Sequence, residues 1–399
     1  MDLLDDFTKS YVLLCLRIDQ LIPGYVDAYM GPPEIKEEVI SEGKQDLTSL
    51  HREAGRLLAQ VHELGCGENR RNFLEKQLTS IHTTLRELKG ENIPYEKKLS
   101  LYYDISPQCV DDDLFEEAMS ELDGLLPGAG SVRDRFMKRR KMFELPLERA
   151  KDLVDRVLRE SQTRTKEFIE MPFGERVETE LVQGKIWDGF NTYLDNYRSK
   201  IQINVPLEGF RLIPLMCHEA YAGHHTERTM KEHLLYKGQG FGEHAVFIMR
   251  SPENLVANGI GNNAADVLFS EVELQEWLAN NIYSEIGIGE VDVLTEVKIA
   301  GVLKKLSGVR TKAARMLHEE GLPIAKVRDY LERYLLINEK QSERVLNRIR
   351  DPFSHMNIHV YHYGEQLVRR YLQKGDHKEL LRRLISQQVY PSLIEEWSK

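Results

Sequence analysis

Four residues that can bind a metal or activate a metal-bound water lie together near the middle of the chain. They fall in the segment His218-Glu219-Ala220-Tyr221-Ala222-Gly223-His224-His225. A neutral imidazole is a common zinc ligand, and a carboxylate beside it can take a proton from a water held by the metal. The pattern predicts a metal centre in which His218 binds the ion and Glu219 acts as the general base.

The spacing leaves the second histidine ligand open. In the usual H-E-x-x-H pattern this ligand would stand at position 222, which is alanine here. On a regular helix His225 shares a face with His218, whereas a break near Gly223 would bring His224 round instead. Both histidines are candidates.

A short β region is predicted immediately before the motif. Apolar residues alternate with polar ones in 177–182 and again in 201–205, a pattern typical of strands. The apolar run 212–217 then leads directly into His218. We expect a hairpin or small sheet followed by a buried helix that carries the motif.

The rest of the chain has the spacing of amphipathic helices. Apolar residues recur three and four apart over about 3–88 and 291–387, and a further helix is predicted from about Asp111 to Leu125. We expect a mainly α fold that forms one large helical domain. It would consist of an N-terminal helical part over about 1–175 and a metal-site part over about 176–399.

Several segments on both sides of the motif follow a known pattern. They are Lys185-Ile186-Trp187, Phe190-Asn191-Thr192-Tyr193, Asn196-Tyr197-Arg198-Ser199, Ile105-Ser106-Pro107 through Leu125-Leu126-Pro127-Gly128, and Tyr361-His362-Tyr363-Gly364. With the histidine motif they make the chain resemble the domain of unknown function 885 family over about 90–380. The resemblance implies a helical zinc peptidase, distantly similar to the gluzincins and to helical carboxypeptidases.

The same resemblance implies a role for each motif residue. The family signature, H-E-x-x-P-G-H followed by H or Y, makes His218 and His224 the zinc ligands and Glu219 the base. His225 would then stand beside the ligands or face the substrate. The Tyr-x-x-Gly pattern makes Tyr361 the phenol that donates to the oxyanion of the reaction; the alternative is a helix tyrosine whose hydroxyl is satisfied elsewhere.

Two positions depart from the family pattern. Ala222 replaces the proline, which should permit a more regular helix. Asn258 stands where the family has the glutamate that serves as third zinc ligand. An amide oxygen is a weaker donor than a carboxylate, so zinc affinity should fall unless Glu253 or Glu271 swings in or a different metal is used.

Other polar residues suggest further roles. Arg198 could bind the terminal carboxylate of a peptide, with an ordinary salt bridge as the alternative. Three histidines, His355, His359 and His362, have spacings that place them on one face of a helix. They predict a polar or pH-sensitive face near Tyr361, or alternatively a second metal site.

Composition narrows the possible partners. The chain has 399 residues and a formal net charge of -10, without the basic stripe that nucleic acid binding requires. It has no apolar run long enough to span a membrane and no basic leader, and its four cysteines lack metal-site spacing. We expect a cytoplasmic protein that binds neither nucleic acid nor membrane, and no oligomeric state is predicted.

The sequence therefore predicts a zinc-dependent peptidase that acts on short peptides with one zinc ion as cofactor. The alternative is a homologue that has lost turnover and binds peptides or proteins, since Asn258 replaces the third-ligand glutamate. A third possibility is a structural helical protein whose histidines are polar core residues. Bound metal separates the third possibility from the first two, and turnover separates those two from each other.

Overall fold

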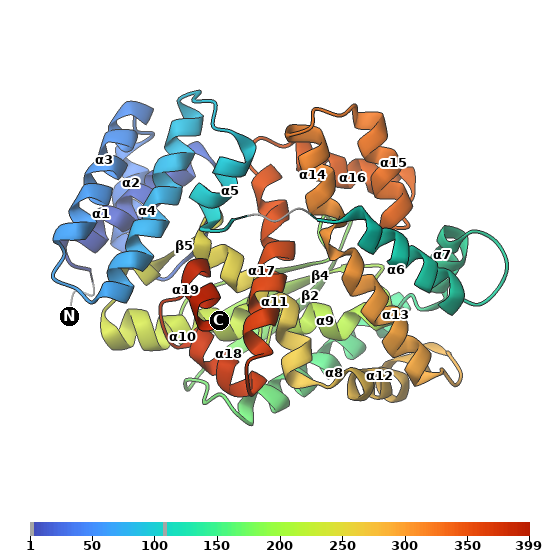
Figure 1. The fold of residues 1–399 in the computed structure, drawn as a ribbon. Helices are drawn as coiled ribbons and strands as arrows, with labels where there is room; N and C mark the ends of the chain where they lie inside the picture. The colour runs from blue at the N-terminus through green and yellow to red at the C-terminus, as the bar shows by residue number, and fades with distance from the viewer. Residues whose placement is uncertain (1–3, 107–109) are drawn as a thin grey trace.

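The computed structural model describes residues 4–106 and 110–399 and consists mainly of α-helices (Figure 1). This confirms the predicted fold class, a mainly α body with a small sheet before the motif helix. Among the described residues, no helix combines the length and the apolar character that a bilayer span requires. Pro107, which belongs to one of the family-like segments, lies outside the described residues.

The N-terminal elements form a bundle at one end of the molecule, drawn in blue in Figure 1. They are α1 (Asp6–Leu21), β1 (Val26–Tyr29), α2 (Pro33–Glu42), α3 (Leu47–Gln60) and α4 (Glu68–Leu88). Asp5 and Asp46 cap α1 and α3 by accepting hydrogen bonds from backbone N–H groups. The inward faces of the helices share one apolar core, and β1 pairs antiparallel with β5 (Val246–Ile248) from the middle of the chain.

A second bundle lies at the opposite end (Figure 1). Its helices are α6 (Asp112–Leu125), α7 (Val132–Met142), α13 (Val293–Lys305), α14 (Val309–His318), α15 (Ile324–Tyr334) and α16 (Glu339–Arg350). Apolar residues from these distant segments form a core of their own. The side chain of Asp111 accepts from the N–H of Asp113, so the helix predicted from about Asp111 to Leu125 is confirmed.

A three-stranded sheet precedes the motif helix. It consists of β2 (Arg176–Gln183), β3 (Gly189–Tyr193) and β4 (Arg198–Val205), in the order β2-β4-β3. The two predicted strands are confirmed, but they are parallel neighbours and do not form a hairpin with each other. The antiparallel partner of β4 is β3, which the sequence analysis missed. Parallel strands need a connection between them, and here that connection contains β3.

The centre of the molecule is formed by helices from both halves of the chain. They are α5 (Tyr95–Tyr103), α8 (Leu147–Lys166), α9 (Gly209–Glu219), α10 (His224–Lys231), α11 (Pro252–Leu268), α12 (Glu271–Leu278), α17 (Ile358–Leu372), α18 (His377–Ile385) and α19 (Pro391–Trp397). Their apolar faces share one core with β4. In Figure 1, α11 and α17 run side by side through this region.

Two glycines allow α11 and α17 to approach until their backbones touch. A Cβ atom at Gly259 would lie 2.3 Å from the carbonyl oxygen of Gly364, and a Cβ atom at Gly364 would lie 2.3 Å from that of Leu255. Neither close contact can be relieved by a side-chain rotation, because both involve backbone atoms. The Gly in the Tyr-x-x-Gly pattern therefore sets the distance between these helices.

Replacing Gly364 by alanine is expected to destabilise the protein by about 1–3 kcal/mol, because the added methyl group forces α11 and α17 apart. Urea unfolding of the variant beside the wild type measures this loss. Gly301→Ala in α13 is the matched control, since a Cβ atom there meets nothing within 4 Å. Equal unfolding free energies for Gly364→Ala and the wild type would contradict this close backbone contact between α11 and α17.

Candidate metal centre

The motif helix breaks between Glu219 and His224, where α9 ends and α10 begins. Ala222 has a left-handed backbone with φ of 67°, and its N–H donates to the Thr226 hydroxyl at 2.9 Å. The expectation that Ala222 permits a more regular helix is therefore wrong. A proline, whose φ is fixed near -65°, could not take this conformation.

Gly223 is required by the break for steric reasons. A Cβ atom at this position would lie 2.1 Å from the carbonyl oxygen of His218 and 2.2 Å from that of Cys217. The turn thus folds directly back on the last residues of α9. This close return carries His224 to His218.

The break places two imidazoles and a carboxylate together. One possible ligand atom from each of His218, Glu219 and His224 lies within 4.8 Å of the others. The centroids of the two imidazole rings are 4.6 Å apart, and the ring planes are nearly perpendicular, at 83°. Among the described residues this is the one group of His, Cys, Asp and Glu side chains close enough to hold a metal ion. The structure brings together the two ligands and the base that the family resemblance implied.

Both histidines have the chemistry that a metal ligand needs. Burial lowers the pKa of His218 to about 4 and that of His224 well below its ordinary value, so both rings are neutral near pH 7. The Nδ1 atom of His224 is buried and has no hydrogen-bond partner among the described residues. Neutral imidazoles with a free nitrogen fit a divalent cation such as zinc.

Glu219 lies close to the two histidines and contacts strand β3 of the sheet. Its side chain is only 7% exposed, and burial raises its pKa to about 8, against the lowering effect of the positive charge of Arg228. The side chain of Asn191 in β3 donates to the Glu219 carbonyl oxygen. Gly189 in the same strand leaves room for the carboxylate arm, since a Cβ there would lie 3.1 Å from Glu219 Cγ.

Tyr361 lies on the open side of the cluster. Its ring centroid is 6.4 Å from that of His218, and the residue is 39% exposed. Gly261 of α11 packs against His218, because a Cβ atom there would lie 2.7 Å from Nδ1. The Gly259–Gly364 crossing holds α17 next to this contact, which explains how Tyr361 reaches His218 from 143 positions along the chain.

Asn258 is buried on the face of α11 that turns toward His218. It stands three residues before Gly261, one helical turn, and is 5% exposed. Its side-chain NH₂ donates to the carbonyl oxygen and to the side chain of Asn254, both at 2.9 Å. These bonds orient the amide and leave its oxygen without a hydrogen bond among the described residues.

The two glutamates considered as substitutes for the missing ligand lie elsewhere. Glu253 accepts from Lys231 at 2.9 Å and from Gln77 at 3.1 Å. Burial would raise the pKa of Glu253, but the charge of Lys231 holds it at about 2. Glu271 is exposed at the start of α12. Lys231 also contacts Glu227, and this buried network fastens α10 to α11.

His225 is separated from His218 by the break. It is fully buried, and its ring nitrogens contact the Ser199 hydroxyl at 2.9 Å and the Glu175 carboxylate at 3.0 Å. Both nitrogens are thereby used within the protein. Of the two histidines, His224 is the one that lies beside His218, and a substrate contact by His225 has no support in this geometry.

Two other groups singled out from the sequence lie apart from the cluster. Arg198 begins β4 and pairs with Asp195 at 3.0 Å. His355 precedes α17, so the three histidines do not share one helix face as predicted. His359 contacts the Tyr95 hydroxyl at 2.7 Å, whereas His362 contacts Ser307 at 3.2 Å, and they do not form a metal-binding group among the described residues.

Arg228 is a site residue that the sequence analysis missed. It stands four residues after His224 in α10, is 4% exposed, and donates to Asp27 of β1. Its guanidinium carbon lies 4.6 Å from the centroid of the Phe247 ring. The spacing of four from His224 is a signal that could have identified it, but nothing local links it to Asp27, about 200 residues away.

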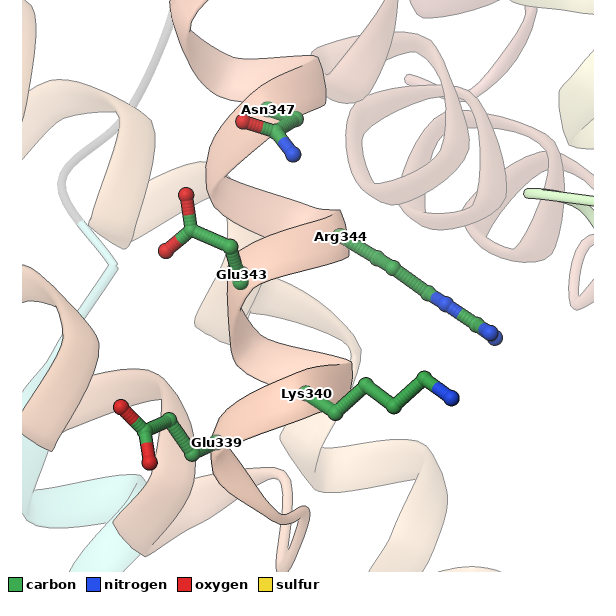
Figure 2. A pocket seen from close by; sticks show the side chains of 5 residues that line it. All are labelled: Glu339, Lys340, Glu343, Arg344 and Asn347. Carbon is green, nitrogen blue, oxygen red and sulfur yellow. The ribbon is translucent and has the colours of Figure 1, made fainter.

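A surface hollow on α16 is unrelated to this centre. Its lining residues are Glu339, Lys340, Glu343, Arg344 and Asn347, all on one helix. Figure 2 shows Lys340 and Arg344 extending away from that helix and Glu343 lying on its other side. Such a hollow has no second wall of converging groups, so it is not a candidate active site.

Comparison with known proteins supports the fold. No protein-family model and no curated protein matches the sequence. The chain is similar to the crystal structure of the M32 carboxypeptidase from Deinococcus radiodurans R1, with a TM-score of 0.50 and 13% sequence identity. The likeness covers 98% of this chain and 94% of the carboxypeptidase chain. The protein therefore has the fold of a carboxypeptidase over nearly its whole length.

Proposed function

We propose that the protein is a zinc-dependent peptidase that acts on short peptides and belongs with the domain of unknown function 885 family. The observation that carries the proposal is the break after Glu219, which gathers two neutral imidazoles and a carboxylate within 4.8 Å. The carboxypeptidase-like fold supports the same reaction class, because the neighbour acts on peptides. Metal-dependent peptide hydrolysis needs a bound Lewis acid beside a proton acceptor, and this cluster has two ligands for the ion and a carboxylate for the proton.

In the proposed reaction each residue has one task. His218 and His224 would hold the ion, and Asn258, one helical turn from the Gly261 that packs on His218, would complete the site. A bound zinc ion supplies Lewis-acid polarisation of water and of the peptide carbonyl. Glu219 takes the proton from the attacking water and passes it to the leaving amine. The Tyr361 hydroxyl donates to the carbonyl oxygen as negative charge develops on it.

One observation favours a second candidate function, a peptide-binding protein without turnover. Asn258 offers a neutral oxygen where the family has a carboxylate. Lower zinc affinity would leave the surrounding groups able to bind a peptide without cleaving it. The two candidates differ in metal content and in hydrolysis.

Elemental analysis of the purified wild type beside Asn258→Glu, with a peptide library assayed on the same samples, distinguishes the two candidates. We expect near-equimolar zinc and peptide cleavage in the wild type. Asn258→Glu should bind zinc at least about tenfold more tightly, since a carboxylate replaces an amide oxygen. Asn347→Glu on the exposed face of α16 is the matched control and should leave zinc affinity unchanged.

The other outcomes are equally informative. A wild type without metal and without activity, together with an Asn258→Glu variant that gains zinc, supports the peptide-binding function. If neither protein binds zinc, the metal centre itself is wrong.

A further inference from the structure

Two arginines near Tyr361 are in no ion pair with a carboxylate of the described residues. Arg310 lies at the start of α14 and is exposed, and Arg348 lies on α16 and is half-buried. Among the described residues neither forms an ion pair, although the chain carries a formal net charge of -10. Arginines left unpaired in an acidic protein are available to bind an anion.

Arg348 is placed next to the candidate metal centre through Tyr361. Its guanidinium carbon is 6.0 Å from the centroid of the Tyr361 ring, and that ring is 6.4 Å from the ring of His218. A ligand that touches both Arg348 and Tyr361 therefore reaches the side of the centre where the proposed carbonyl oxygen lies.

Arg310 approaches the same place from α14. The turn before it packs on α17, because Ser307 contacts His362 at 3.2 Å and a Cβ atom at Gly308 would lie 3.0 Å from the His362 ring. The charge of Asp188 stabilises the Arg310 guanidinium, and the positive charges of Arg348 and Arg211 oppose it. The two unpaired guanidinium groups are thus close enough to repel each other.

A further arginine lies on α9, the helix that carries His218. Arg211 stands seven residues before His218, two turns along the same face of α9, and pairs with Asp188 at 2.5 Å. Asp188 precedes Gly189, the residue that lies against Glu219. Arg140 and Arg211 share a second carboxylate, Glu208. The charges of Arg140, Arg211 and Arg310 thus act on two carboxylates, Asp188 and Glu208, which leaves an excess of positive charge near the centre.

We propose that Arg310 and Arg348 form a subsite that binds a carboxylate of the peptide substrate, next to Tyr361 and the candidate metal centre. This inference rests on the proposed peptidase function and specifies the class of substrate. That class is peptides with a carboxylate close to the scissile bond, from either the free C-terminus or an acidic side chain. The guanidinium fork matches the two oxygens of a carboxylate, and a bound anion removes the repulsion between the two arginines.

Three blocked tripeptides distinguish the two sources of the carboxylate. One has uncharged side chains and a free C-terminal carboxylate, the second is its C-terminal amide and carries no charge, and the third is the amide with aspartate as last residue. We expect the wild type to prefer at least one carboxylate peptide over the neutral amide by about tenfold or more in kcat/KM. A preference for the free acid alone identifies the C-terminus, and a preference for the aspartyl amide identifies the side chain.

The variant Arg310→Gln/Arg348→Gln should lose this preference, mainly through a higher KM for the carboxylate peptides, so that all three peptides are cleaved with similar kcat/KM. Arg310→Lys/Arg348→Lys keeps the positive charges but lacks the planar guanidinium groups. It should show only part of the wild-type preference for carboxylate peptides. The control is Arg344→Gln, an exposed position one turn from Arg348 whose side chain extends away from α16 in Figure 2. Thermal unfolding verifies that each variant is folded.

Calorimetric titration of the metal-free protein with the same three peptides separates this proposal from the peptidase function. If no peptide is cleaved but a carboxylate peptide binds more tightly to the wild type than to the glutamine variant, the subsite stands and the peptidase function fails. If all three peptides are cleaved equally and the glutamine variant behaves as the wild type, the subsite fails and the peptidase function stands.

Discussion

Glu219→Gln is expected to lower kcat for peptide hydrolysis by about 10²–10⁴-fold while zinc content stays at the wild-type value. Glutamine keeps the size of the side chain but cannot take a proton from the attacking water. The side chain is buried between the imidazoles and β3, so no other described carboxylate lies within ligand distance of His218 and His224 to replace it.

Steady-state kinetics and elemental analysis of one preparation test this expectation. Glu276→Gln, an exposed position in α12, controls for the change of charge and should have wild-type kcat. Unchanged turnover in Glu219→Gln would assign the base elsewhere. Loss of zinc together with turnover would make Glu219 a ligand instead of a base, since a carboxylate oxygen lies within 4.8 Å of a nitrogen of each imidazole.

Local sequence patterns predicted the secondary structure well wherever one face of an element is buried. The helix that begins after Asp111 and the strands at 177–182 and 201–205 were recognised from capping and alternation. The pairing of β2 with β4, and the insertion of β3 between them in the chain, could not be recognised. Strand pairing depends on which backbones meet in space, and alternation within one strand carries no information about its neighbour.

The sequence patterns identified the candidate residues of the site but not their arrangement in space. The choice between His224 and His225 depends on backbone dihedrals at Ala222 and Gly223, which a helical wheel does not contain. The regular helix expected from Ala222 failed because the returning chain is anchored by Thr226 and by the close contact of Gly223. Local propensity was overridden by these contacts.

Residues far apart in the chain were the hardest to assign to the site. Arg228 pairs with Asp27, and Arg348 lies over Tyr361, through packing between separate helical bundles. Arg198, by contrast, was a candidate because of its neighbours in sequence, and it pairs with the nearby Asp195. Proximity along the chain therefore led to the two candidate ligands, but it also favoured Arg198, which lies apart from the cluster.

Gly223→Ala is expected to remove the metal centre and to destabilise the protein by about 3 kcal/mol. The added Cβ would lie 2.1 Å and 2.2 Å from the carbonyl oxygens of His218 and Cys217, and backbone atoms cannot rotate away. Relief requires the turn to open, which moves His224 from His218. Zinc affinity should fall by at least about 100-fold, since one histidine ligand is lost.

Denaturant unfolding and zinc titration of Gly223→Ala beside Gly124→Ala make the comparison. Gly124 lies inside α6, where a Cβ atom meets nothing within 4 Å, so its replacement should keep both stability and zinc affinity. A Gly223→Ala variant that binds zinc like the wild type would mean that the ligands do not depend on this turn. In that case His225, which shares a face with His218 on a continuous helix, would again be a candidate for the second ligand.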